Sequence, residues 1–335
     1  MSEIKAFTGV DDRVMLADSI PIKTPFTLNV FPTNTCNFKC SYCAQSLGLQ
    51  QLKEDYNISS GNMTISLINK IIEQAEVFPD KFKLVSFMGH GEPLANPNLI
   101  EMVKIIKQSD IAGRVDMITN GSLLTKNRSK QLISTGIDVI RISLQGISSK
   151  SYKRVSGIDI DFGEFLENLS YLYEIREQTQ IFVKTMDVSL EKGEQEKFYN
   201  IFSMISDRMF IDRVKPVYDL VEYDETASDL SMDRYGEMHD KRDVCPQPFY
   251  MLSVWPDGTV SPCDALYKAS PLGNIETDNL SRMWQSDTLR DFRIEQLRCA
   301  RHTNRSCRRC CAPDDVIHKE DILDDSAEML LKKFI

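Results

Sequence analysis

Between residues 26 and 218 the chain alternates short apolar runs, rich in β-branched residues, with amphipathic stretches. This alternation is typical of repeated βα units, which build a parallel sheet covered by helices. The predicted strands are 26–31, 83–88, 114–119, 139–144, 180–188 and 212–218, and the predicted helices are 66–78, 98–108, 125–135, 162–177 and 194–206. Six units are too few to close an eight-stranded barrel. We therefore predict an α/β fold, a partial (β/α)6 TIM-like barrel with its site at the carboxyl ends of the strands.

A second unit is expected after the barrel. Two apolar runs surround Pro256, Asp257 and Gly258, a turn signal that predicts a β-hairpin because glycine readily supplies a positive φ. The stretch before it is acidic and weakly periodic, as in a linker. We divide the chain into an N-terminal extension (1–25), the barrel (26–218) and a linker (219–244). A small hairpin-plus-helix cluster-binding domain (245–313) and an acidic C-terminal helix or tail facing solvent (314–335) follow.

Composition narrows the possible partners. No window approaches the ~18 consecutive apolar residues of a membrane span, and the start lacks the apolar core of a signal peptide, so we expect a cytoplasmic protein with no membrane partner. The net charge of −9 makes nucleic acid an unlikely partner. Five arginines between 298 and 309 form a local basic run, which we interpret as charge compensation for an anionic cluster.

The nine cysteines fall into two groups, three within 36–43 and six within 245–311. Disulfides are rare in a reducing compartment, so this clustering favours metal binding. Cys36, Cys40 and Cys43 follow the first predicted strand with C-x3-C-x2-C spacing. Three thiolates around one cubane leave one iron free to bind an exchangeable ligand. A zinc site is the alternative, but it normally needs a fourth ligand, and no further Cys or His lies nearby in sequence.

At these residues the sequence resembles the radical S-adenosylmethionine (SAM) superfamily, whose hallmark is the same loop with an aromatic residue, here Tyr42, before the last cysteine. The resemblance implies a [4Fe-4S] cluster whose free iron chelates S-adenosyl-L-methionine. One electron then cleaves the sulfonium, and the resulting 5′-deoxyadenosyl radical abstracts a substrate hydrogen. The resemblance also implies a reducing partner such as flavodoxin or ferredoxin. The protein itself contributes placement and exclusion of water.

Further short elements resemble the same superfamily in the expected order along the chain. FMGHGEPL (87–94) is similar to its GGEP element, with His90 in place of the first glycine, either a tolerated variant or a residue that reaches the cofactor. ITNG (118–121) and ISLQG (142–146) end the next two strands. Lys184 is either a partner of the methionine carboxylate or a structural residue. The cofactor contacts implied by the resemblance are Tyr42, Gly89, Gly91, Glu92, Asn120, Ser143 and Lys184.

The C-terminal cysteines resemble the SPASM and twitch appendages of the superfamily, in which a hairpin and a following helix carry auxiliary clusters. A full SPASM set has seven cysteines for two clusters, whereas this pattern suggests a single auxiliary [4Fe-4S] cluster. The ligands implied are Cys245, Cys263, Cys307 and Cys310. Cys299 and Cys311 either replace one of these or are plain thiols. A structural zinc on the same four thiolates is the alternative.

Four functions are considered. The first is oxidation of a small hydroxylated substrate of sugar or cyclitol type, with the auxiliary cluster accepting an electron, since the single-cluster spacing is similar to that of the 2-deoxy-scyllo-inosamine dehydrogenase family. The second is peptide or protein maturation of the RiPP type, which we expect less because only about 25 residues precede the first predicted strand. Sugar epimerisation is a further alternative. A plain electron carrier would not explain an iron left open beside a cofactor-binding set.

Overall fold

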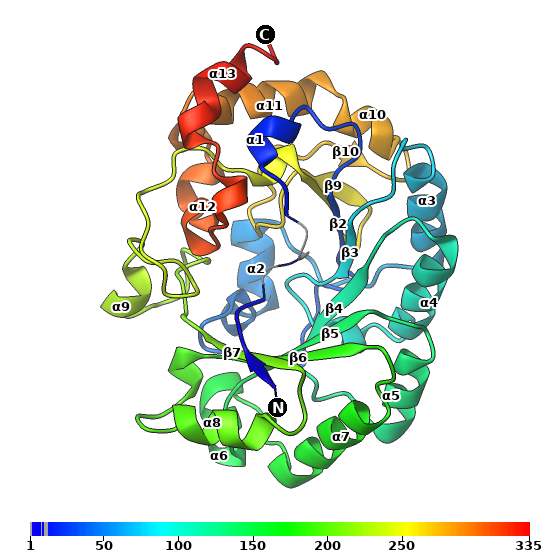
Figure 1. Ribbon diagram of the computed structural model, residues 1–335, viewed down its shortest axis with the longest axis vertical. Coiled ribbons are helices and arrows are strands. Elements are labelled where there is room, and N and C mark those ends of the chain that lie inside the picture. Colours follow the sequence, from blue (N-terminus) through cyan, green and yellow to red (C-terminus); the bar gives the residue numbers. More distant parts are fainter. Residues whose placement is uncertain (1, 8, 10–12) are drawn as a thin grey trace.

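The computed structural model describes residues 2–7, 9 and 13–335 and is built around one ten-stranded sheet (Figure 1). The strand order is β1-β7-β6-β5-β4-β3-β2-β8-β9-β10. Neighbouring strands from β2 to β7 are parallel. The sheet has two free edges, so the prediction of an open partial barrel is confirmed. Its barrel strands are β2 (Thr27–Val30), β3 (Leu84–Phe87), β4 (Val115–Thr119), β5 (Val139–Leu144), β6 (Gln180–Met186) and β7 (Arg208–Asp212).

Helices cover the outer face of this sheet (Figure 1). Thr64 and Thr125 begin two of them, because each hydroxyl accepts a hydrogen bond from a backbone N–H of the first turn. Two helices that the pattern did not predict lie in the βα loops, α2 (Leu49–Tyr56) and α6 (Ser149–Ser156). The predicted helices are α3 (Ile65–Ala75), α4 (Leu99–Ser109), α5 (Lys126–Ile133), α7 (Phe162–Glu174) and α8 (Gln195–Phe202).

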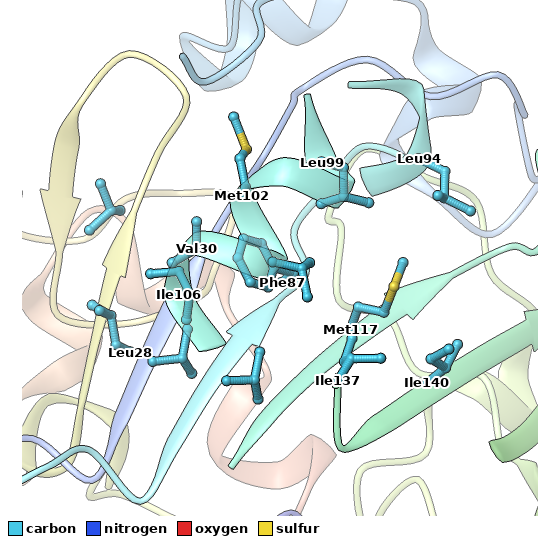
Figure 2. Packing of buried hydrophobic residues seen from close by; sticks show 14 of the residues in the cluster. Leu28, Val30, Phe87, Leu94, Leu99, Met102, Ile106, Met117, Ile137 and Ile140 are labelled. Carbon is cyan, nitrogen blue, oxygen red and sulfur yellow. The ribbon is translucent and has the colours of Figure 1, made fainter. Parts of the chain in front are cut away.

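Strand periodicity separates an apolar outer layer from a polar barrel interior. Leu28, Val30 and Phe87 pack against Met102 and Ile106 of α4, as Figure 2 shows. The residues between them point into the barrel, because successive strand side chains face opposite sides. Several of these inner residues are polar and hydrogen-bonded across the interior. Asn29 donates to Ser253, Arg141 donates to Ser86 and Asp116, and Lys184 donates to Asp212.

The sixth barrel strand lies earlier than predicted. We expected it at 212–218, but β7 ends at Asp212 and pairs with β6 through Met209 and Val183. Beyond Asp212 the chain leaves the ladder, because the backbone N–H of Val214 donates to the Asp187 carboxylate instead. Pro216, shortly afterwards, has no N–H to offer a neighbouring strand.

The C-terminal hairpin extends the barrel sheet. β8 (Met251–Val254) pairs in parallel with β2, so the domain that carries the second cysteine group is joined to the barrel by backbone hydrogen bonds. β9 (Thr259–Ser261) returns antiparallel through the predicted turn, where Gly258 has a φ of 80°. β10 (Gly273–Asn274), α10 (Leu280–Trp284) and α11 (Asp287–Leu297) follow.

Both ends of the chain pack onto the body of the protein. β1 (Glu3–Ile4) pairs with β7, and α1 (Leu16–Ser19) lies beside the C-terminal α13 (Ala327–Leu331) (Figure 1). Leu330 is buried in one apolar cluster with Leu16 and Phe249. The expectation of a solvent-facing C-terminal helix or tail is therefore wrong, because its leucines fill this cluster. Part of the predicted N-terminal extension, residues 1, 8 and 10–12, lies outside the described residues.

Residues 219–244, predicted as a linker, also make internal contacts. They contain α9 (Glu225–Ser228), and Arg234 pairs with Asp315 of α12 (Ala312–Asp315). Within residues 2–7, 9 and 13–335, every helix is too short or too polar to cross a lipid bilayer.

Candidate active site and cluster sites

The first cysteine group lies in the loop after β2, at the carboxyl end of the barrel. Cys36, Cys40 and Cys43 line a cavity of about 250 Å³. The structure brings every cofactor-contact residue expected from the sequence to the same cavity: Tyr42, Gly89, Gly91, Glu92, Asn120, Ser143 and Lys184. Residues from five segments of the chain thus meet at the strand ends, as a parallel barrel requires.

The three thiols are close enough for electrostatic repulsion between them to raise the pKa values of Cys36 and Cys40. Burial, with smaller contributions from Glu92 and Cys43, raises the pKa of Cys36 to about 12. Burial likewise raises the pKa of Cys40, with added repulsion from both other thiols. Among the described residues, no three His, Cys, Asp or Glu side chains converge closely enough to bind a single metal ion. Binding of any metal or cluster to these thiols would displace their protons.

The loop after β3 fits against the cysteine loop because of its glycines. A Cβ on Gly91 would lie 2.5 Å from the carbonyl oxygen of Thr33 and 2.6 Å from that of Thr35. Gly89 has a φ of 131°, in a region that side chains disfavour. The Glu92 N–H then donates to the Thr35 carbonyl at 2.9 Å. The glycines thus allow the two loops to touch through their backbones.

Glu92 ties the end of β3 to the end of β4. Its Oε1 accepts hydrogen bonds from the Thr119 hydroxyl at 2.6 Å and the Leu94 N–H at 2.9 Å, and its Oε2 accepts one from the Asn120 N–H at 2.7 Å. Burial raises the pKa of Glu92, while these hydrogen bonds act to lower it. The side chain therefore shapes the cavity wall, and any contact with a cofactor ammonium adds to these bonds.

We predict that Glu92→Gln weakens S-adenosylmethionine binding to the reconstituted protein. Losing a hydrogen bond to a charged ammonium costs about 1.5–3 kcal/mol, or roughly ten- to a hundred-fold in Kd. Calorimetric titration measures the change, and Glu101→Gln, at a solvent-facing position of α4, serves as the control. A lowered Tm with an unchanged Kd would show that Glu92 only holds the two loops together.

Other residues expected at the cofactor have partners within the protein. The Lys184 ammonium pairs with Asp212 at 2.6 Å, so its charge is already balanced. The Asn120 side chain donates to Asn37 at 2.9 Å and lies near the Cys36 thiol. Burial raises the pKa of the Tyr42 hydroxyl, which lies near Gln145 and Ser189. Their assignment to S-adenosylmethionine remains a prediction, with Lys184 equally suited to holding Asp212.

The second group forms a separate thiol pocket beside the hairpin. Cys245, Cys263, Cys307 and Cys310 line it together, as their assignment to one cluster requires. Arg301 also lines this pocket and donates to the carbonyl oxygens of Cys307 and Cys310, at 3.2 and 3.1 Å. Burial raises the pKa of Cys307 to about 12, while the Arg301 charge acts to lower it. Arg301 thus places positive charge where an anionic cluster would bind.

The other members of the basic run and the remaining cysteines lie elsewhere. Arg309 pairs with Asp219 at 2.6 Å and stacks over Tyr267. Cys299 is exposed. Cys311 is buried outside the lining of the thiol pocket, and this burial, together with the Asp315 charge, raises its pKa. Of the five arginines, Arg301 is the one that lines the thiol pocket.

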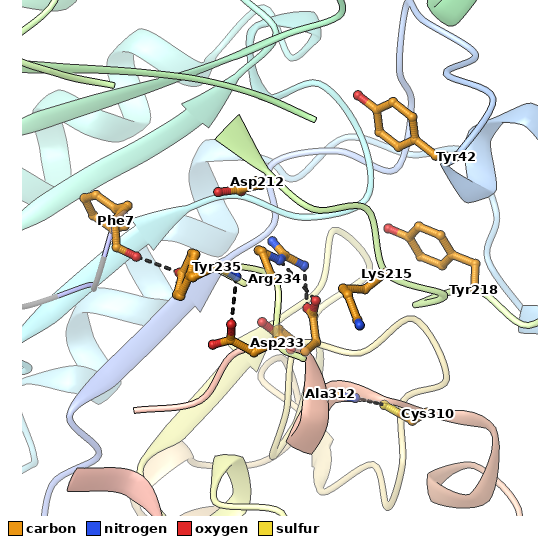
Figure 3. A network of polar contacts seen from close by, with 12 residues as sticks. Phe7, Tyr42, Asp212, Lys215, Tyr218, Asp233, Arg234, Tyr235, Cys310 and Ala312 are labelled. Carbon is orange, nitrogen blue, oxygen red and sulfur yellow. Dashed lines mark hydrogen bonds and ion pairs between the residues drawn. The ribbon is translucent and has the colours of Figure 1, made fainter. Parts of the chain in front are cut away.

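A second cavity lies next to the first and reaches the second cysteine group. It measures about 310 Å³, reaches Cys310, and shares Gly89, Val217, Tyr218 and Arg234 with the first cavity. Figure 3 shows Arg234 between Asp212, at the end of β7, and Cys310. Sequence reasoning missed Tyr218 and Arg234, because neither lies in a motif and residues 219–244 have no clear periodicity. No signal in the sequence marked them.

The comparisons with known proteins agree with this arrangement. The model of the radical SAM superfamily matches residues 30–189. The SPASM model, described as an iron–sulfur cluster-binding domain, matches residues 245–311. The chain belongs to the radical SAM superfamily. Within it, the chain is a member with a SPASM domain, and its cofactors are S-adenosylmethionine and [4Fe-4S] clusters.

Curated relatives match only part of the chain. The Pyrococcus furiosus tungsten-containing aldehyde ferredoxin oxidoreductase cofactor-modifying protein is 33% identical over 112 residues, 33% of this chain and 28% of that protein. A probable GTP 3′,8-cyclase of Saccharolobus islandicus is 28% identical over 181 residues, 50% of this chain and 54% of the cyclase. The chain therefore spans about half or less of the length of these relatives.

Solved structures match more of the chain at lower identity. BtrN in complex with AdoMet and 2-DOIA is 19% identical with a TM-score of 0.54, over 86% of this chain and 92% of BtrN. Streptococcus suis SuiB bound to the precursor peptide SuiA is 16% identical with a TM-score of 0.58, over 80% of this chain and 66% of SuiB. At these identities the likeness shows the shared fold.

Proposed function

We propose that this radical SAM protein oxidises a small hydroxylated substrate, of sugar or cyclitol type, between its two cysteine groups. Two neighbouring cavities carry the proposal, one lined by Cys43 and the other by Cys310, because a substrate bound at the residues they share lies near both groups. When bound, the first cluster with S-adenosylmethionine supplies a radical that removes a substrate hydrogen, and the second cluster accepts the remaining electron. An external reductant such as flavodoxin or ferredoxin would supply the first electron.

The walls of the second cavity, which reaches Cys310, suit a substrate with hydroxyl groups. Arg234 pairs with Asp315 there, and Asp264 presents a carboxyl group that is bonded to Gln247 at 2.8 Å. Burial raises the pKa of Asp264. Hydroxyls both donate and accept hydrogen bonds, so they match a wall that alternates carboxylates with cations. An apolar substrate would desolvate these groups without offering them a hydrogen bond.

Segments from both ends of the chain cover the same cavity. Arg13 and Asp321 line it and pair with each other at 2.5 Å, joining the N-terminal region to the C-terminal one. Val316 and His318 line it beside them. A volume of about 310 Å³ under this cover favours a small molecule over an extended peptide.

Among the solved structures with a similar fold, one was bound to a small molecule and another to a peptide. BtrN was solved with AdoMet and 2-DOIA, and SuiB with its precursor peptide. The match extends over 92% of BtrN and 66% of SuiB, so SuiB has more structure outside the shared part. Together with the covered cavity, this supports the small-molecule substrate.

A substrate panel tests the proposal. We expect sugars or aminocyclitols to stimulate 5′-deoxyadenosine formation by the dithionite-reduced protein, with a product lighter by two hydrogens in mass spectrometry. Arg234→Gln should weaken that stimulation about ten- to a hundred-fold at subsaturating substrate, as expected for a lost charged hydrogen bond. Arg290→Gln, on the surface of α11, is the matched control. Stimulation by peptides alone, or a product of unchanged mass, would contradict the proposal and indicate maturation or epimerisation.

A further inference from the structure

His90 lies on the seam between the barrel and the hairpin domain. It follows β3, at the position where the resembled element has a glycine. Its ring stacks on Trp255, which follows β8, with centroids 5.6 Å apart and planes 12° apart. Phe31, which follows β2, meets the ring edge-on at 5.8 Å. These contacts hold the imidazole in one orientation between the two cysteine groups.

Both ring nitrogens of His90 have partners. Nε2 lies 2.9 Å from the backbone carbonyl oxygen of Asp264, the residue after Cys263, and Nδ1 lies 3.2 Å from the Tyr218 hydroxyl. A carbonyl oxygen can only accept, so Nε2 carries the hydrogen. In the neutral ring, Nδ1 then accepts a hydrogen bond from the Tyr218 hydroxyl. Burial lowers the pKa of His90 to about 4, which agrees with a neutral ring.

Tyr218 continues this connection to the first cysteine group. It lines the cavity of that group together with Tyr42 and Cys43, and Figure 3 shows the Tyr42 and Tyr218 rings. Burial raises the pKa of the Tyr218 hydroxyl, and the nearby Cys43 thiol adds to this rise. Tyr218, His90 and the backbone from Asp264 to Cys263 therefore form a series of neighbouring groups between a cysteine of the first group and one of the second.

We propose that Tyr218 and His90 form an electron-transfer bridge between the two iron–sulfur sites. This inference rests on the proposed function, in which substrate oxidation leaves one electron at the auxiliary site. Through the bridge that electron returns to the S-adenosylmethionine site and replaces the one spent in cleavage. One site is oxidised and the other reduced by one electron, and no further reactant is consumed. A route of closely neighbouring groups, two of them hydrogen-bonded to His90, couples two sites more strongly than an empty gap of the same length.

The test uses the reconstituted holoprotein without substrate or S-adenosylmethionine. A flash of photoreduced deazaflavin delivers less than one electron per chain, and freeze-quench electron paramagnetic resonance follows its redistribution between the two clusters. We expect severalfold slower redistribution in Tyr218→Phe, which removes only the hydroxyl. The same is expected in His90→Phe, which keeps an aromatic ring against Trp255. His90→Gln, whose amide can still donate to the Asp264 carbonyl, should restore part of the rate.

Tyr223→Phe is the matched control. The Tyr223 hydroxyl donates to the backbone oxygen of Tyr42 at 3.0 Å, next to Cys43, and it is not part of the bridge. Wild-type redistribution rates in both Tyr218→Phe and His90→Phe would overturn the proposal. If His90→Phe fails to assemble its clusters, the redistribution rate in Tyr218→Phe alone tests the proposal, because this variant leaves the bond between His90 and Asp264 intact. A wild-type protein that cleaves no S-adenosylmethionine contradicts the proposed function instead, so the two failures are distinguishable.

Discussion

Replacing Cys36, Cys40 and Cys43 together by alanine is expected to abolish S-adenosylmethionine cleavage. Anaerobically reconstituted wild-type protein should bind about eight irons, as two four-iron clusters do, and the triple variant about four. The reason is local, since these three thiols are the cysteines that line the cavity with the expected cofactor contacts. Iron analysis and chromatographic detection of 5′-deoxyadenosine after dithionite reduction measure both effects.

Cys299→Ala is the control for this experiment. Its thiol is exposed and lies outside the linings of both cysteine sites. We expect the variant to keep the iron content and the cleavage activity of the wild type. Cleavage that survived in the triple variant would disprove the assignment of the S-adenosylmethionine site.

Replacing Cys307 and Cys310 by alanine is expected to separate cleavage from substrate oxidation. The variant should still form 5′-deoxyadenosine, because its first cysteine group is intact, but it should make no oxidised product. Both residues line the thiol pocket, and Arg301 fixes their backbone through their carbonyl oxygens. Product analysis by mass spectrometry, with a substrate identified in the panel, measures the loss.

Cys311→Ala provides a close comparison, since this buried thiol is adjacent to Cys310 in sequence and lies outside the pocket lining. It should retain both clusters and full product formation. A folded double variant, shown spectroscopically to lack the second cluster, would contradict the prediction if it made product at the normal rate. The auxiliary cluster would then be structural, and the oxidation would need another electron acceptor.

The barrel strands could be predicted because their signal is local. In β5, apolar Ile140 and Ile142 alternate with polar Arg141 and Ser143, and the burial of the apolar pair follows this period. The sixth strand was misplaced because Val214 and Val217 suggest a strand while nothing nearby in sequence shows that the Asp187 carboxylate captures the Val214 N–H. The C-terminal residues looked solvent-facing because their charges dominate the composition, although Leu330 is fully buried.

The sequence by itself determined the chemistry of the two cysteine groups and the order of the strand-end motifs, because spacing and alternation are properties of neighbouring residues. Only the tertiary structure decided what lies between the two groups. Tyr218 lies 128 residues from His90, and His90 lies 174 residues from Asp264, yet each pair is in hydrogen-bonding contact. Contacts at such separations depend on the pairing of β2 with β8, which no periodicity in a single segment encodes.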